Sequence, residues 1–102
     1  MNSKRKGNAG EMEVVHLLRD AGYDAHRNDQ RYTGGKEWPD VGGVPGYHLE
    51  IKRTERFNLY DAMEQAEQDA NGKSVPVVLH RRNKKPWVAV IRMEDFLRLV
   101  SK

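Results

Sequence analysis

Three patterns of apolar and polar residues along the chain predict its main elements. Between Ala9 and Ala21 apolar residues recur every three or four positions, which predicts an amphipathic helix that ends at Gly22. From Tyr47 to Arg53 the pattern alternates with a period of two, which is typical of a strand. The run Trp87–Ile91 does not alternate, and it favours a strand covered on both faces.

Turn and capping residues divide the rest of the chain. Asn58 is a good N-cap with Asp61 at the capping-box position, and Asn71-Gly72 ends the helix that Asn58 begins. The segment Asn28–Lys36 is polar and has no period, so we predict a loop. The other predicted elements are a strand over Tyr23–Arg27, a strand leading into a turn at Val44–Gly46, strands over Val75–His80 and Trp87–Arg92, and a helix over Met93–Val100.

Together these elements predict an α/β fold. Their order is helix, three strands, helix, two strands and helix (αβββαββα). Because a crossover helix joins two of the strands, we expect a mixed five-stranded sheet flanked by helices. The 102 residues favour a single domain over residues 1–102.

The composition fits a small globular domain that is stabilised by packing alone. Hydrophobic residues make up 37% of the chain and charged residues 32%, and the lack of cysteine excludes disulfides, cysteine–zinc sites and cysteine nucleophiles. No apolar run approaches the roughly 18 residues that a membrane span needs, and no signal-peptide segment follows the basic start. We therefore expect a cytoplasmic protein without a membrane partner.

Positive charge is modest in amount but clustered in position. The formal net charge is +3, which weakly favours a polyanionic partner. Most charge clusters only solubilise a protein, but three clusters that flank acidic residues favour contacts with phosphates. The clusters are Lys4, Arg5 and Lys6, in a basic and flexible arm expected over residues 1–8; Lys52, Arg53 and Arg56; and Arg81, Arg82, Lys84 and Lys85 in one turn.

Two carboxylates are predicted to face each other across a hairpin. If Leu49 and Ile51 anchor the core, Glu50 points to the opposite side of its strand, together with His48 and Lys52. A three-residue loop at positions 44–46 would set Asp40 directly opposite Glu50, with the two Cβ atoms about 4.5–5.5 Å apart. Two carboxylates at this distance repel unless a cation lies between them, and Mg²⁺ or Mn²⁺ suits such oxygen ligands. Glycines at positions 42 and 43 also allow a bulge, so a different register stays open.

Glu11 is a third candidate for this site. It precedes Val14, Val15 and Leu18 by three, four and seven positions, so it lies in line with the buried stripe of the first helix. The alternative is that Glu11 only complements the positive N-terminal end of that helix. Spacing alone favours the alternative.

Three other features were considered for chemistry. The stretch NGKS (Asn71–Ser74) lacks the glycine that a phosphate-binding loop needs at position 67, where Glu67 stands. The four histidines have no zinc-like spacing, although His48 could line a substrate groove. Trp38 could stack on bases, whereas Trp87 fits the core better.

The motifs as a set resemble a known nuclease superfamily. Pro39-Asp40 (PD) followed by Glu50-Ile51-Lys52 (EIK) resembles the signature of the PD-(D/E)XK nucleases. With KGNAGE (Lys6–Glu11) before them, a helix ending near AGY and EQ at Glu64-Gln65, the chain is similar over almost its whole length to archaeal-type Holliday-junction resolvases and their phage-borne relatives. One departure is that DQRYTGGKEW (residues 29–38) has no serine where those resolvases carry a catalytic-loop serine, so either Thr33 substitutes or junction handling differs.

The resemblance implies a restriction-endonuclease-like core and a role for each motif residue. Asp40 and Glu50 would bind Mg²⁺, for which Mn²⁺ could substitute, and the Ile51 carbonyl would complete the ligand shell. Lys52 would orient or polarise the attacking water. The remaining implied site residues are Glu11, which would reach the metal directly or through water, and Gln65, which would support the site.

The function implied is a metal-dependent, structure-selective DNA endonuclease, a Holliday-junction resolvase that cuts branched DNA symmetrically. Because a four-way junction needs two nicks and the chain carries one site, this reading requires a homodimer. Either of two apolar sets could form the interface or belong to the core: Phe96, Leu97 and Val100, or Leu59, Tyr60 and Met63. The alternatives are a nuclease of the same fold that nicks or cuts linear or flap DNA without junction preference, and a catalytically inactive DNA-binding module.

Overall fold

The computed structural model describes residues 3–28 and 39–101, and of residues 3–6 only the backbone. The predicted loop after Asn28, with Thr33, and also Trp38 lie outside the described residues. The described elements follow the predicted order, which is thereby confirmed. They are α1 (Ser3–Asp20), β1 (His26–Arg27), β2 (Val41–Gly42), β3 (Tyr47–Arg53), α3 (Leu59–Ala70), β4 (Val75–Arg81), β5 (Val88–Val90) and α4 (Met93–Val100).

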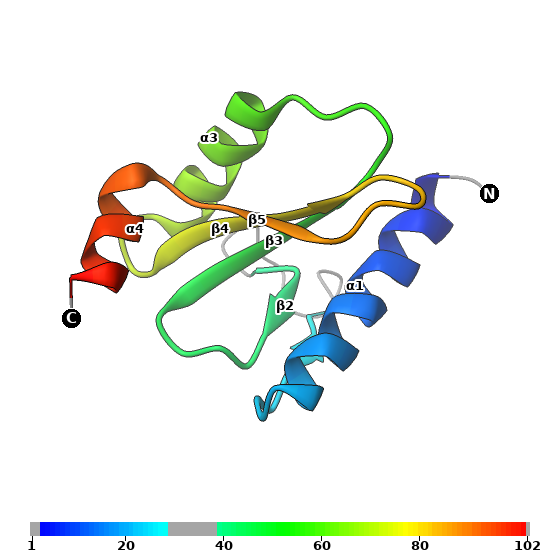
Figure 1. Cartoon of the computed structure of the whole chain (residues 1–102), viewed down its shortest axis with the longest axis horizontal. Helices are drawn as coiled ribbons and strands as arrows, with labels where there is room; N and C mark the ends of the chain where they lie inside the picture. Colours follow the sequence, from blue (N-terminus) through cyan, green and yellow to red (C-terminus); the bar gives the residue numbers. More distant parts are fainter. Residues whose placement is uncertain (1–2, 29–38, 102) are drawn as a thin grey trace.

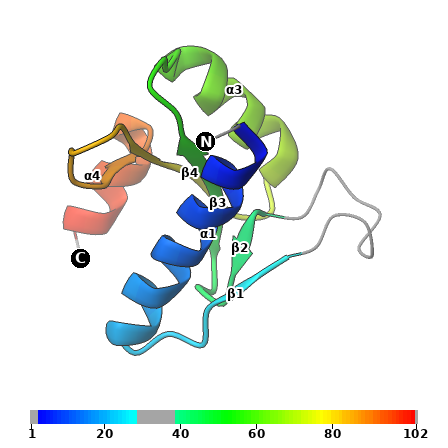
Figure 2. The ribbon, with the colours of Figure 1, turned by 90° about the vertical axis from the view of Figure 1, so that its right-hand side faces the viewer.

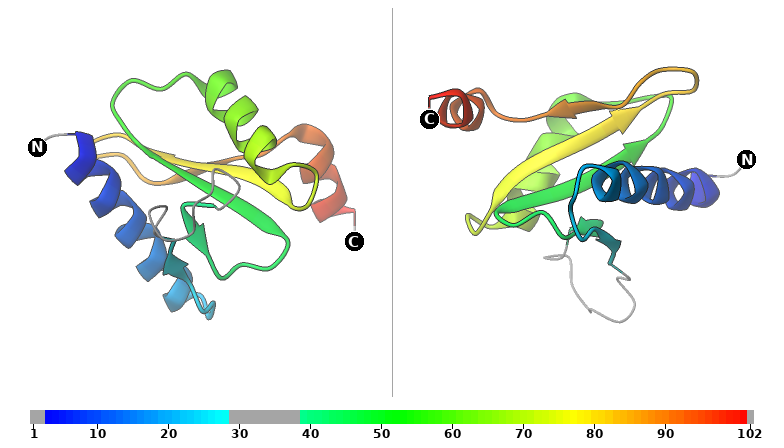
Figure 3. Two further views of the ribbon diagram at one scale, coloured as in Figure 1. Left: turned by 180° about the vertical axis from the view of Figure 1, so that it is seen from behind. Right: turned by 60° about the horizontal axis from the view of Figure 1, so that its bottom comes forward.

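The strands form one mixed five-stranded sheet, as predicted. Its order is β1-β2-β3-β4-β5, so neighbours in the chain are also neighbours in space. β3 and β4 are parallel and are joined through α3, whereas the other pairs are antiparallel. α1 lies against one face of the sheet and α3 against the other, while α4 lies past the end of the strands (Figures 1 and 3).

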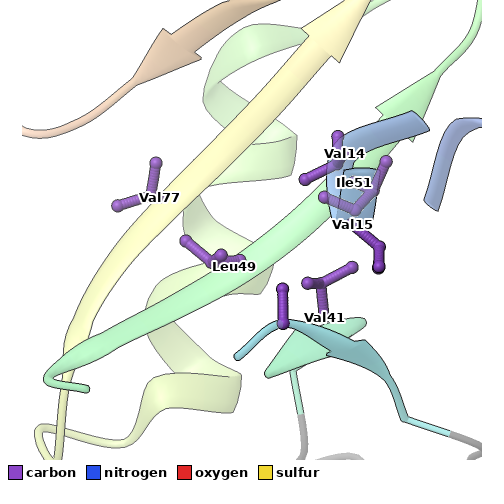
Figure 4. Packing of buried hydrophobic residues seen from close by; sticks show 7 residues of the cluster. Val14, Val15, Val41, Leu49, Ile51 and Val77 are labelled. Atoms are coloured by element: carbon purple, nitrogen blue, oxygen red, sulfur yellow. The ribbon is translucent and has the colours of Figure 1, made fainter. Parts of the chain in front are cut away.

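Two apolar clusters hold the layers together. The larger lies between α1 and the sheet, where Val15 and Val41 are fully buried beside Leu49 and Ile51 (Figure 4). The smaller lies under α3 and consists of Ala62, Met63, Ala66 and Val78. The predicted alternation of β3, with Leu49 and Ile51 facing the core, is confirmed. The face with α1 therefore supplies most of the apolar burial.

The caps of α3 are also as predicted. The Asn58 side-chain oxygen accepts a hydrogen bond from the Asp61 backbone N–H at 3.0 Å. At the other end, Asn71 adopts the left-handed conformation with φ of 50° and its N–H bonds to the Glu67 carbonyl. These contacts fix where α3 begins and ends, and hence which of its side chains face β3.

Several predictions about individual elements differ from the structure, including the bounds of the last strand, which covers Val88–Val90 rather than Trp87–Arg92. α1 begins at Ser3 rather than Ala9, because its first turns are polar and leave no apolar period to detect; residues 3–8 are thus helical rather than a separate arm. β1 covers only His26–Arg27 instead of Tyr23–Arg27. β5 was expected to be covered on both faces, and this was wrong: it is the last strand of the sheet, and Val88 is 50% exposed.

Among the described residues, no helix combines the length and the apolar character that crossing a membrane requires.

Candidate metal centre

The hairpin between β2 and β3 brings the two predicted carboxylates together. Val41 pairs with Leu49, which is the register predicted for this hairpin, and just before β2 the Asp40 backbone N–H donates to the Leu49 carbonyl at 3.0 Å. The turn into this hairpin depends on Gly43, whose φ is +104° and where a Cβ would overlap the backbone of Asp24. A glycine at this position therefore lets β2 lie close enough to β1 for the sheet to form around the site.

The Asp40 carboxylate is held by the backbone of the neighbouring strand. Its Oδ2 accepts a hydrogen bond from the Ile51 N–H at 2.8 Å. Asp40 is half-buried, and its carboxylate lies close enough to Glu50 to raise the pKa of Glu50. This contact orients a ligand before any cation binds.

Glu50 lies in a buried polar cluster that joins β3 to α3. Its Oε1 is 2.8 Å from the His48 Nε2, and both side chains are buried. Asp69 approaches from α3, and the ligand atoms of His48, Glu50 and Asp69 all lie within 4.8 Å of one another. The Gln65 side-chain amide donates to both Asp69 oxygens, at 3.1 and 3.2 Å. Gln65, predicted to support the site, thus holds a carboxylate that faces Glu50.

The surroundings disfavour a negative charge on Glu50. Burial, and then the nearby carboxylates of Asp40 and Asp69, raise the pKa of Glu50 to about 9. Burial also lowers the pKa of His48, despite the same carboxylates. From the protein groups alone, both side chains are therefore uncharged near neutral pH, and their short contact is a neutral hydrogen bond rather than an ion pair.

The donor set fits a divalent cation. Two further carboxylates, from Asp40 and Asp69, lie near Glu50, and both raise the cost of ionising Glu50. A bound cation reverses this effect, because it stabilises the ionised form of all three. Carboxylate oxygens are the ligands that Mg²⁺ and Mn²⁺ prefer. Divalent-cation binding is thus consistent with these residues, and the choice of Mg²⁺ stays a prediction.

Two pockets open along the same face of β3. One of about 370 Å³ is lined by Lys52, Arg56 and Gln65 among others. The second, of about 300 Å³, is lined by His48 and Asp69 among others. Because positions 48, 50 and 52 succeed one another on this face, Glu50 lies between the two pockets. Lys52 is thereby on the same face as Glu50, as the sequence pattern predicted.

Glu11 approaches the site from α1. Its Oε1 accepts a hydrogen bond from the Arg27 Nε at 2.9 Å, and Arg27 also donates to the Asn8 side chain at 3.0 Å. Burial raises the pKa of Glu11, the hydrogen bond to Arg27 opposes that shift, and the charge of Asp40 adds to it. The effect of Asp40 shows that Glu11 lies near that carboxylate, although Glu11 is not a member of the cluster formed by His48, Glu50 and Asp69.

The basic clusters divide into free and engaged side chains. Arg53 is bound to Asn83 at 2.6 Å and to Glu55 at 3.3 Å, so it ties β3 to the turn after β4. Arg81 is half-buried and lies 3.6 Å from Glu13, which is an electrostatic contact too long for a hydrogen bond. The exposed members are Arg56, Arg82, Lys84 and Lys85, whereas the side chains of Lys4, Arg5 and Lys6 lie outside the described part.

Three residues at this site were not singled out as ligands or partners from the sequence. Asp69 gave no signal, since only the packing of α3 brings it to Glu50. His48 was noticed because it shares a strand face with Glu50, but it was assigned only a place in a groove. Arg27, which binds Glu11, lies in a two-residue strand without a pattern of its own.

Comparison with known proteins supports the fold. No family model matches the chain, and the comparison with curated proteins gave no match. Among solved structures, the chain is similar to the 1.6 Å structure of Archaeoglobus fulgidus Hjc, a Holliday junction resolvase from an archaeal hyperthermophile. The TM-score is 0.62 at 24% identity, over 84% of this chain and 72% of that one. The predicted restriction-endonuclease-like core is thereby confirmed as a fold.

Proposed function

We propose that this chain is a metal-dependent, structure-selective DNA endonuclease that resolves four-way junctions as a homodimer. The observation that carries the proposal is the close approach of the Asp40 and Glu50 carboxyl groups at the β2–β3 hairpin, with Lys52 on the same face of β3 as Glu50. Phosphodiester hydrolysis needs an activated water and positive charge near the phosphate, and this set of residues can provide both. The fold shared with an archaeal resolvase agrees with this chemistry.

Each residue of the site has a separate task in this proposal. Asp40, Glu50 and the Ile51 carbonyl would hold Mg²⁺, for which Mn²⁺ could substitute, and the ion would polarise the phosphate and activate water. Lys52, which lines the larger pocket, would orient the attacking water and offset charge on the scissile phosphate. Gln65 would keep Asp69 in place, and Glu11 would add negative charge beside Asp40.

The exposed cations favour DNA binding at one end of the molecule. The first turns of α1 and the tip of the β4–β5 turn lie side by side in several views (Figures 1 and 3). The contact of Trp87 with Glu13 at 3.2 Å, and the tie from Arg53 to Asn83, hold this end together. The pocket lined by Lys52 and Arg56 begins where β3 ends. DNA bound at this end of the molecule would therefore lie next to the site.

Assembly as a dimer is supported by the exposed apolar side of α4, a helix that lies apart from α1 and α3 (Figure 2). One of its two acidic residues, Asp95, is buried, and Arg92 and Arg98 donate hydrogen bonds to its carboxylate at 3.2 and 2.9 Å. The opposite side of the helix is apolar and faces outward. There, Met93, Phe96, Leu97 and Val100 are 69%, 46%, 52% and 59% exposed.

An outward apolar stripe of this kind is typical of a protein interface. A second copy of the chain is the partner that junction cutting requires, so we assign this stripe to the dimer contact. The other apolar set considered is less suited, because Met63 is buried in the α3 cluster. Light scattering should give about twice 11.8 kDa, and Leu97→Glu should reduce that mass to one chain.

The function is tested by incubating the protein with a labelled four-way junction and a matched linear duplex, each with Mg²⁺ or EDTA. Paired nicks in the junction that require Mg²⁺ and are lost in Asp40→Asn are expected. Equal cutting of the duplex, or a clean monomer in solution, would instead favour the nuclease without junction preference. Binding of the junction without any cleavage would favour the inactive DNA-binding module.

A further inference from the structure

We propose that His48, Glu50 and Asp69 hold a second divalent cation, on the side of Glu50 away from Asp40. Glu50 would then be shared by two ions, one held with Asp40 and one held with His48 and Asp69. The second site has a mixed nitrogen and oxygen donor set, which suits a first-row transition metal such as Mn²⁺ better than Mg²⁺. The inference rests on the proposed function only for the use of this ion in DNA cleavage, not for its binding.

The geometry is that of a ligand set. Two donors at about 2.1 Å on opposite sides of one ion lie about 4.2 Å apart. The donor atoms of the three residues lie within 4.8 Å of one another, so small side-chain rotations bring them to one ion. Among the described residues, this is the one group of three or more histidine and acidic side chains with such spacing. Asp40 is outside the group, which is why the two ions would occupy different positions.

The surroundings of the group also favour a cation. His48 is 3% exposed and Glu50 8%, yet their hydrogen bonds within the described residues lead to each other and to acids rather than to lysine or arginine. A purely structural contact would satisfy His48 and Glu50 without a further acid from α3. Asp69 adds that acid at a half-buried position, where a bound cation would offset the repulsion between the two carboxylates.

Asp69 is oriented as metal ligands usually are. The Gln65 amide donates to both oxygens of the Asp69 carboxylate and so restricts its orientation. The same carboxylate also contacts Glu50. A route from solvent is present as well, since His48 and Asp69 both line the pocket of about 300 Å³. Three protein ligands leave further coordination positions open to water.

The experiment is a calorimetric titration of Mn²⁺ into chelator-treated protein. Wild type is expected to bind two ions per chain, and Asp40→Asn and Asp69→Asn one ion each. Glu50→Gln should weaken both sites, because both share that carboxylate. His48→Gln should lower the affinity of one site for Mn²⁺ by at least about tenfold, with a smaller loss for Mg²⁺.

Paramagnetic broadening by Mn²⁺ locates the ion independently of enzyme activity. In Asp40→Asn protein, backbone NMR signals around Asp69 should broaden at low Mn²⁺ concentration, and this effect should disappear when Asp69→Asn is added. Asp20→Asn is the matched control, since Asp20 is exposed at the end of α1 on the opposite face of the sheet and its loss should change neither titration nor spectrum. Asn is nearly isosteric with Asp, so each variant is expected to fold, and circular dichroism is the measurement that checks this.

One ion per chain that is lost in Asp40→Asn and unaffected by Asp69→Asn would overturn the proposal. So would a single ion that both variants abolish, because all the carboxylates would then share one position. Failure of the nuclease proposal gives a different result: two Mn²⁺ sites with the expected variant pattern, but no cleavage of any DNA.

Discussion

The two faces of β3 are buried to a similar extent, but their burial has opposite effects on the stability of the protein. Toward α1, Leu49 and Ile51 are 5% and 8% exposed and join the larger apolar cluster. Toward α3, His48 and Glu50 are 3% and 8% exposed, and they face other ionisable groups. Burial of the first pair stabilises the fold, whereas burial of the second costs free energy unless its charges are compensated.

The contrast between the two faces explains how a chain of 102 residues can maintain a buried polar cluster. One strand places both sets of side chains, so the apolar face fixes the backbone from which the polar face projects. α3 then covers the polar face with small residues, Ala62 and Ala66, which let the helix approach closely. The predicted consequence is that changes on the apolar face reduce stability, while changes on the polar face affect cation and DNA chemistry.

The largest effect is expected on the rate of DNA cleavage when a carboxylate of the site is replaced. Asp40→Asn should lower the cleavage rate by at least about 10³-fold, because it removes a metal ligand, while the unfolding midpoint stays close to that of wild type. DNA affinity should be kept or increased, since a negative charge facing phosphates is lost. Single-turnover cleavage of a labelled junction measures the rate, and filter binding of the same junction measures the affinity. Cleavage near the wild-type rate would remove Asp40 from the site.

The apolar face should show the reverse pattern. Ile51→Ala is expected to lower the free energy of unfolding by about 2–5 kcal/mol, because it leaves a cavity between α1 and the sheet. Urea denaturation followed by circular dichroism measures this. Val88→Ala is the control, since Val88 is half-exposed on the edge strand and its truncation should cost far less. Equal losses at the two positions would contradict the division of roles between the faces of β3.

Because burial disfavours the ionised form of Glu50, the stability of the protein should depend on pH. The folded pKa of Glu50, about 9, is above that of an unfolded glutamate, so the folded state loses stability as pH rises from about 4.5 to 9. Glu50→Gln cannot ionise and should be the more stable protein at pH 8 in EDTA, by at least about 1.4 kcal/mol, with the difference shrinking toward pH 4.5.

Thermal unfolding at several pH values tests this expectation. Glu64→Gln, an exposed change on α3, keeps Glu50, so its difference in stability from wild type should not depend on pH in this way. Addition of Mn²⁺ should stabilise wild type and leave Glu50→Gln nearly unchanged. A wild-type protein whose stability in EDTA is flat between pH 5 and 9 would mean that Glu50 is not disfavoured as a charged group.

The smallest effect concerns the helix that covers the polar face. Asn58→Ala removes the N-cap of α3 and should cost about 1 kcal/mol of stability. Because α3 also carries Gln65 and Asp69, hydrogen exchange should increase along this helix more than along α1. Asn58→Asp is the matched variant, since it retains the capping oxygen and should restore both measurements. Uniform changes over both helices would show that the cap supports the whole domain rather than this face.

Local patterns were enough to predict much of the molecule. The caps of α3, the bounds of β3 and α4 and the order of all elements depend on neighbouring residues, so the sequence determined them. The same holds for Asp40 and Glu50, since a three-residue turn sets the register between them. The resemblance to junction resolvases added the expected fold, which the comparison supports.

Only the tertiary structure decided what distant segments do to one another. Asp69 is nineteen positions after Glu50 in the chain, and the crossover through α3 alone returns it to the same face of β3. The edge position of β5 and the outward apolar stripe of α4 were equally hidden, because an apolar pattern shows that a face needs cover but not what covers it. Periodicity describes one element at a time, whereas burial depends on which elements pack together.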